Sequence, residues 1–268
     1  MPVTTSLNVL NNEAKAPKWD EVRDAAAAAF RGHLYQTPFS GRTTKLLTPP
    51  GANTKLAKGS VPIYGLTLAP AGSSGYQLCP WRSPECEAAC LGITAGRSKF
   101  SNVRNARITK TVYLMSDPYT FFRQLYKELH AASRKHGYEG FGFRSNVLSD
   151  IAWESIAPQM YEFCGNNYDY TKSFARAINS RRRGRMEAPL HLTLSYSGHN
   201  HDQCVEYLNA GGNVAVVFRK DLPDRCMGAR VINGDLSDAR FLDPKGGYVI
   251  GLKAKGNINL NSVFVWNA

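Results

Sequence analysis

Short apolar segments alternate with helix-like segments through most of this chain, and this alternation limits the folds open to it more than any other feature. An early apolar segment is followed, about 70 residues later, by six more that recur at intervals of roughly 17 to 27 residues, which suit strand and helix units. They are residues 61–70, 141–143, 168–170, 190–194, 214–218, 231–232 and 248–252. Such alternation is typical of βαβ units and a parallel sheet. We therefore expect an α/β fold with mostly parallel strands, arranged as a complete or partial (β/α) barrel, with residues 263–266 as an edge strand.

The clearest helix is predicted between Asp117 and Gly137. Asp117 can cap its first turn, Pro118 suits the first helical position, and Gly137 suits its end. Apolar residues recur at helical spacing in between: Phe122, Leu125, Tyr126, Leu129 and Ala132. This stripe predicts core packing.

The remaining helices are expected at residues 19–31, ended by Gly32, from about Cys86, after Gly96, at 151–164 with a break near Pro158, at 174–180 and at 201–210. Residues 36–60 are rich in Thr, Pro, Gly and Lys and are interpreted as a loop. We divide the chain into an N-terminal extension, residues 1–60, with a short helix and this loop, and a single α/β barrel-like domain, residues 61–268. A chain of 268 residues is long enough for that domain to bury its own core.

Three cysteines lie within twelve residues, in the order C-x6-C-x3-C: Cys79, Cys86 and Cys90. Soft thiolate ligands select zinc, copper(I) or iron–sulfur clusters, and structural zinc takes four protein ligands. Since this segment offers only three, we favour a [4Fe-4S] cluster with one iron open to another ligand. Zinc and a role without metal stay open as alternatives. Cys164 and Cys204 are interpreted as core residues, and Cys226 as a distant candidate for a fourth ligand.

Polar residues repeatedly follow the predicted strands, and the cysteine segment follows the first of them. In barrels and open parallel sheets, the carboxyl ends of the strands carry the active site. We therefore expect these polar residues to bind a substrate beside the cysteines. The candidates are Arg144, Asn146, Asp150, Asp169, Lys172, Ser195, Asp235 and Lys253.

The chain carries 33 basic and 21 acidic residues, a formal net charge of +12, which favours nucleic acid or an anionic small molecule as a partner. Arg104, Arg107 and Lys110, together with the basic run 181–185, are the candidate nucleic-acid contacts. No apolar run approaches the roughly 18 residues of a membrane span, and no signal peptide is evident. We therefore expect no membrane association and a cytoplasmic location.

Several segments carry a resemblance to a known family. The cysteine segment is followed by Leu91-Gly and Ala95-Gly-Arg97. Further matching segments are 149–151 (SDI), 168–172 (YDYTK), 191–195 (HLTLS), 212–218 (GNVAVVF), 233–235 (NGD), 240–243 (RFLD) and 251–256 (GLKAKG). Over residues 60–265 the chain resembles the gene product 88 family, an uncharacterised family of tailed-phage proteins named after a mycobacteriophage gene product. The resemblance implies a phage origin and action in the host cytoplasm.

A looser resemblance is to radical S-adenosylmethionine enzymes, which hold a three-cysteine cluster after the first strand of a partial barrel. Their usual spacing is C-x3-C-x2-C, whereas this chain has C-x6-C-x3-C. Their glycine-glycine-glutamate motif is not evident, since residues 211–213 read GGN. S-adenosylmethionine is thus implied as a cofactor only by this looser resemblance.

Three functional hypotheses follow. The first is an iron–sulfur protein with its cluster at a barrel mouth, for redox or radical-type chemistry. The second is a nucleic-acid-binding protein whose metal site is structural, which would bind with a steep salt dependence. The third is a zinc-dependent hydrolase that uses a metal-bound water.

Overall fold

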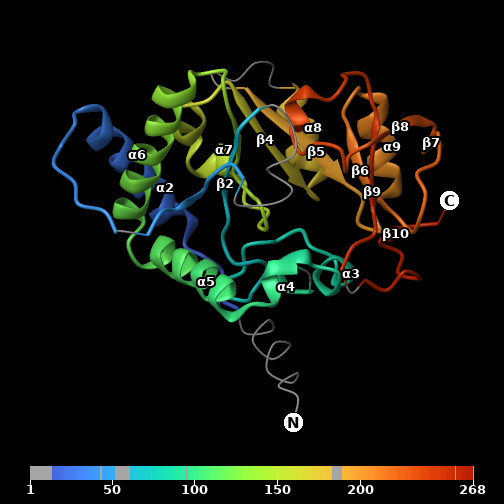
Figure 1. The fold of residues 1–268 in the computed structure, drawn as a ribbon, viewed down its shortest axis with the longest axis horizontal. Coiled ribbons are helices and arrows are strands. Elements are labelled where there is room, and N and C mark those ends of the chain that lie inside the picture. The colour runs from blue at the N-terminus through green and yellow to red at the C-terminus, as the bar shows by residue number, and fades with distance from the viewer. Residues whose placement is uncertain are drawn as a thin grey trace, which may run out of the picture.

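The protein has an α/β fold in a computed structural model that describes residues 14–42, 44–51, 61–94, 96–182, 189–256 and 258–267 (Figure 1). The strands are β1 (Leu47–Thr48), β2 (Ile63–Leu66), β3 (Gly142–Arg144), β4 (Asn166–Thr171), β5 (Leu190–Ser195), β6 (Val214–Phe218), β7 (Arg225–Cys226), β8 (Ala229–Asn233), β9 (Val249–Lys253) and β10 (Val265–Trp266). The longer helices are α2 (Trp19–Leu34), α5 (Ser101–Ser116), α6 (Pro118–His136), α8 (Phe174–Arg182) and α9 (His201–Asn209). The short ones are α3 (Pro84–Ala88), α4 (Leu91–Thr94), α7 (Trp153–Ile156), η1 (Gly96–Lys99), η2 (Pro158–Tyr161) and η3 (Arg240–Leu242).

Within the described ranges, all ten strands belong to one mostly parallel sheet, as the alternating pattern predicts. Its order is β1-β2-β3-β4-β5-β6-β9-β8-β7, and β10 pairs with β6. The strands from β2 to β6 pair in chain order and in parallel, and β9 and β8 continue the parallel set. Two-residue strands, β1 and β7, pair antiparallel at the two ends. No pairing among the described strands joins these ends, so the barrel expectation is not confirmed.

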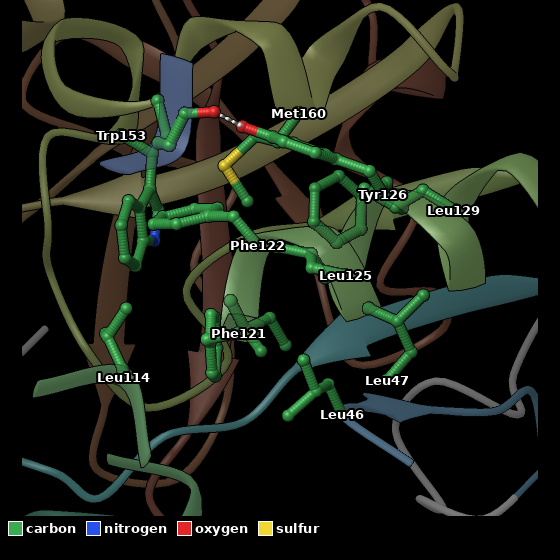
Figure 2. Packing of buried hydrophobic residues seen from close by; sticks show 14 of the residues in the cluster. Leu46, Leu47, Leu114, Phe121, Phe122, Leu125, Tyr126, Leu129, Trp153 and Met160 are labelled. Atoms are coloured by element: carbon green, nitrogen blue, oxygen red, sulfur yellow. Dashed lines mark hydrogen bonds between the residues drawn. The ribbon is translucent and has the colours of Figure 1, made fainter. Parts of the chain in front are cut away.

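Helix α6 forms where the sequence predicts it, and it organises the larger of two main hydrophobic clusters. Asp117 accepts a hydrogen bond from the Thr120 amide at 3.1 Å, and Gly137 takes a φ of +81° at the helix end. The predicted apolar stripe is buried and packs with Trp153, Met160 and β1 (Figure 2). Because this stripe covers one end of the sheet, the larger cluster lies on the α2–α6 side of the molecule (Figure 1).

A second hydrophobic cluster lies between β5, β6 and β9 and helices α8 and α9. It includes Cys204 and Cys226, and Cys164 lies in the first cluster, each with at most 5% of its surface exposed. The prediction of core packing is therefore confirmed for Cys164 and Cys204. In contrast, Cys226 lies in β7 within this cluster, so it is not placed as a fourth ligand for the distant cysteine segment.

Several predicted boundaries need correction. Helix α2 does not end at Gly32 but continues to Leu34, because a glycine inside a helix costs only about 1 kcal/mol and α2 packs along α6. The predicted loop at 36–60 contains β1, which pairs with β2. The predicted break at Pro158 is confirmed, because a short α7 ends before it and η2 begins there. Both α2 and β1 precede residue 61, and the domain boundary stays a prediction.

Two further expectations concern surface and charge. No helix in the described part of the chain combines the length and the apolar character that a membrane crossing needs. Of the basic run 181–185, residues 183–185 lie outside the described residues, and nothing is described for the side chains of the first two.

Candidate functional site

A cavity of about 550 Å³ lies at the carboxyl edge of the parallel strands. Its wall brings together the three cysteines of the 79–90 segment and seven of the eight predicted strand-end residues. These seven are Arg144, Asn146, Asp150, Lys172, Ser195, Asp235 and Lys253. They meet because parallel strands carry their carboxyl ends to one edge of the sheet. Asp169 is the exception: it is fully buried and does not line the cavity.

The cysteine segment folds around α3, which lies with α4 below the strands in Figure 1. Strand β2 leads into it, and turns with positive φ at Ala71 and Gly75 reverse the chain. Ser83 then caps α3 by accepting a hydrogen bond from the Cys86 amide at 3.2 Å, and Pro84 opens the helix. The three cysteines therefore lie just before, within and just after one short helix.

The three thiols share the cavity wall and influence one another electrostatically. Burial, with contributions from Asp150, Cys90 and Cys86, raises the pKa of the Cys79 thiol to about 12, although the hydrogen bond from the Ala71 amide opposes this shift. Burial also raises the pKa of Cys90, while nearby backbone amides and Lys172 oppose this shift. The Cys79 sulfur accepts a hydrogen bond from the Ala71 amide at 3.3 Å. No described cysteine forms a disulfide, so the thiols are available for ligation in their reduced form.

Within the described residues, no group of three or more His, Cys, Asp or Glu side chains is arranged to hold a single metal ion. The three thiols line the same cavity. In an iron–sulfur cluster each thiolate binds a different iron, so its ligands lie farther apart than the ligands of one zinc ion. The zinc and the cluster interpretations of these thiols both stay predictions.

Five cationic side chains in the described part of the chain contribute to the cavity wall. Arg82 pairs with Glu87, and Arg144 donates to Asp238 at 2.9 Å. Lys255 pairs with Asp235, and Lys253 lies 3.5 Å from the exposed Asp221. Lys172 differs from these, because among the described residues its Nζ makes no ion pair and lies 5.5 Å from the Phe264 ring centre. Lys172 is therefore the side chain best placed to meet an anion in this cavity.

A buried charge network supports the cavity floor. Arg176 donates to Asp150 at 2.9 Å and to both oxygens of Glu154 at 2.6 and 2.9 Å, and it lies 3.6 Å from Asp169. Burial raises the pKa of Asp169 to about 7, although Arg176 and Arg144 oppose that shift. The network holds the Asp150 carboxylate at the cavity wall. Sequence reasoning missed Arg176, because nothing in a short helix marks one arginine as buried.

Asn146 links this network to the loop after β3. Its side-chain oxygen accepts from the Ser149 hydroxyl at 2.8 Å and the Ile151 amide at 3.0 Å, and its nitrogen donates to Asp169. Asp169 also accepts from Ser145 at 2.9 Å. Asn146 thus braces the loop that carries Asp150 to the cavity.

The three basic side chains of α5 donate hydrogen bonds to backbone carbonyls of neighbouring segments. Arg107 donates to the Gly92 carbonyl at 3.1 Å, and Lys110 donates to the Leu46 carbonyl at 2.7 Å. The exposed Arg104 donates to the Lys99 carbonyl at 3.1 Å. These contacts hold neighbouring segments in place, and nucleic-acid binding by this helix face stays a prediction.

Fold and site together define an α/β protein with a thiol- and cation-lined cavity at the carboxyl edge of a mostly parallel sheet. The family model described as gene product 88 matches residues 40–268, which is most of the chain. The chain therefore belongs to the gene product 88 family, and this membership supports the phage origin that the sequence resemblance implies. No curated protein and no solved structure gives a significant match.

Proposed function

We propose that the chain is a phage-encoded iron–sulfur protein, in which Cys79, Cys86 and Cys90 hold a [4Fe-4S] cluster against one wall of the cavity. The observation that carries this proposal is that all three thiols line a single cavity together with the strand-end residues. Such a cluster, when bound, supplies one-electron or radical-type chemistry. A reducing host cytoplasm would keep the ligands as thiols.

The donor set fits this group in number and kind. Three thiolates are the soft ligands that iron–sulfur clusters take, and no histidine or fourth cysteine among the described residues lines the cavity. One iron would be left for a ligand within the cavity. The raised pKa values of Cys79 and Cys90 indicate thiols that stay protonated without a metal and lose their protons when one binds.

The cavity itself is suited to a small anionic molecule beside the cysteines. Lys172 is positioned to contact the anion, and Lys253 and Arg144 add positive charge to the wall. Ser195 lies on the same wall and can orient neutral groups of the molecule. A volume of about 550 Å³ is within the range of small-molecule sites.

S-adenosylmethionine is not part of the proposal. The Gly211-Gly212-Asn213 triplet is the segment compared above with the glycine-glycine-glutamate motif of radical S-adenosylmethionine enzymes, and it lacks the glutamate. It precedes β6, at the amino end of the sheet. Asn213 there donates to the Pro244 carbonyl at 3.0 Å and accepts from the Tyr248 amide at 2.9 Å, away from the cavity.

The proposal predicts that oxygen-free purification yields a brown protein with about four iron and four sulfide per chain, and an electron paramagnetic resonance signal after reduction. Cys79→Ala, Cys86→Ala and Cys90→Ala should each lose most of this iron. Cys204→Ala is the matched control, because Cys204 is buried in the second cluster, and it should retain the iron.

A colourless protein with one zinc per chain would overturn the proposal and would favour the zinc hydrolase instead. Equal iron loss in the Cys204 variant would show that the three cysteines are not specific ligands.

A further inference from the structure

We propose that a second pocket, between α2 and α6, binds a phosphate group. The pocket has a volume of about 450 Å³. Its lining residues are His33, Leu34, Gln36, Thr37, Phe39, Arg123, Lys127, His130 and Arg134. Five of these nine side chains are basic, and among the described residues no carboxylate lines the pocket.

The basic residues of α6 are arranged as a stripe toward this pocket. Arg123, Lys127, His130 and Arg134 are spaced at i, i+4, i+7 and i+11, which places them on one face of the helix. Like charges at i,i+4 destabilise a helix by a few tenths of a kcal/mol. A bound anion would offset this repulsion, whereas a helix with a purely structural role gains nothing from a stripe of like charges.

Arg123 gives the strongest indication of a ligand, because it is buried without a carboxylate partner. Only 5% of its surface is exposed, and no ion pair with a described residue reaches it. Its guanidinium donates to the Thr37 hydroxyl, to the Thr37 carbonyl at 2.6 Å and to the Tyr119 hydroxyl at 3.4 Å, and it lies 5.3 Å from the Phe39 ring centre. Its Nε–H is buried and has no acceptor among the described residues. A buried positive charge is costly unless an anion compensates it.

The local sequence makes room for this guanidinium. A Cβ on Gly32 would lie 2.2 Å from the Arg123 Nη1, so any larger residue there would displace the guanidinium from its present position. His33 follows on α2, with its ring 5.2 Å from that of His130. Burial lowers the pKa of His33, and His130 and Arg123 lower it further, so this pocket already carries excess positive charge.

Phosphate is the anion that this set of donors suits best. The planar fork of arginine pairs with phosphate oxygens, and lysine adds a compact charge. The several charges on one face favour a ligand with more than one negative charge over a simple carboxylate. The phosphate could belong to a free phosphorylated small molecule or to the backbone of a nucleic acid, and the experiment separates these two sources.

The test uses the full chain at low salt, with inorganic pyrophosphate and a single-stranded oligothymidylate as probes, measured by calorimetry. Lys127→Gln/Arg134→Gln removes two exposed charges from the pocket. We expect this pair to weaken binding about tenfold or more, since charge-assisted hydrogen bonds are each worth about 1.5–3 kcal/mol. For the oligonucleotide, the logarithmic salt slope should also fall by about 2.

Two controls make the test specific. Arg31→Gln/Lys135→Gln removes the same amount of charge from α2 and α6, at exposed positions that do not line the pocket. This control pair should change binding less than about threefold. Lys172→Gln removes a cation from the cysteine-lined cavity, so any binding that it abolishes belongs to that cavity and not to this pocket.

Binding of pyrophosphate alone would identify a small-molecule source, and binding of the oligonucleotide alone a nucleic acid. The proposal is overturned if neither probe binds, if the pocket pair binds normally, if the control pair loses as much affinity, or if only Lys172→Gln abolishes binding.

Discussion

Three carboxylates and one arginine show how single residues shape the cavity floor. Arg176 is buried between Asp150, Glu154 and Asp169, so one positive charge faces up to three negative ones. Burial, together with the nearby Asp150 carboxylate, raises the pKa of Asp169 to about 7, although Arg176 and Arg144 oppose this shift. Asp169 therefore keeps its proton in the folded protein at pH values where an exposed aspartate has lost it.

The raised pKa of Asp169 predicts a pH-dependent stability. An acid whose pKa is higher in the folded state binds more protons when folded, so this group lowers stability as pH rises from about 4 to about 7. In Asp169→Asn, the decrease of the free energy of unfolding over this pH range should be smaller by an amount on the order of 1–3 kcal/mol. Chemical denaturation at a series of pH values measures this, with the exposed Asp24→Asn on α2 as the control. An unchanged pH profile in Asp169→Asn would contradict the prediction.

At the scale of elements, α3 is the part on which the cysteine geometry depends. A helix of five residues is too short to be stable alone, so its position relies on its cap and its contacts. Ser83 supplies both, because its hydroxyl accepts from the Cys86 amide and donates to the Ser197 carbonyl at 3.2 Å. One side chain thus ties the cysteine helix to the loop after β5.

Removing this cap should loosen the segment. We expect Ser83→Ala to lower the free energy of unfolding by about 1 kcal/mol. If the cluster proposal holds, the variant should also lose iron faster in air. Ser83→Thr retains the hydroxyl and should behave like the unaltered protein in both measurements. The same loss in the threonine variant would show that the cap is not the cause.

At the scale of the whole molecule, one continuous sheet joins the two main hydrophobic clusters. The first cluster includes Trp153, and Trp266 packs against the second. Strands β4 and β5 pair over five residues where the two halves meet. Because the sheet hydrogen bonds cross this junction, neither half can separate without breaking the ladder.

This continuity predicts cooperative unfolding of the two halves. In variants that retain only Trp153 or only Trp266, with the other tryptophans replaced by phenylalanine, fluorescence should give the same denaturation midpoint. Circular dichroism should coincide with both. Two separated midpoints would indicate that the halves unfold independently.

Local patterns in the sequence determined the repeating elements of the fold. The alternation predicted the parallel strands, and the apolar stripe with Asp117 and Gly137 predicted α6, because these signals repeat within a few residues. The same reasoning placed the cysteines and seven polar residues on one edge of the sheet, since parallel strands end together. The roles proposed for these residues stay predictions.

Tertiary structure alone decided the features that join distant parts of the chain. The two-residue strands β1 and β7 exist only through their partners, and the open ends of the sheet follow from these pairings. Burial of Arg176 and Arg123, and the inward contacts of Arg107 and Lys110, depend on segments up to 86 residues away. The sequence does not show whether a charged side chain contacts water, a carbonyl or a cavity, because its environment comes from residues that only folding brings near.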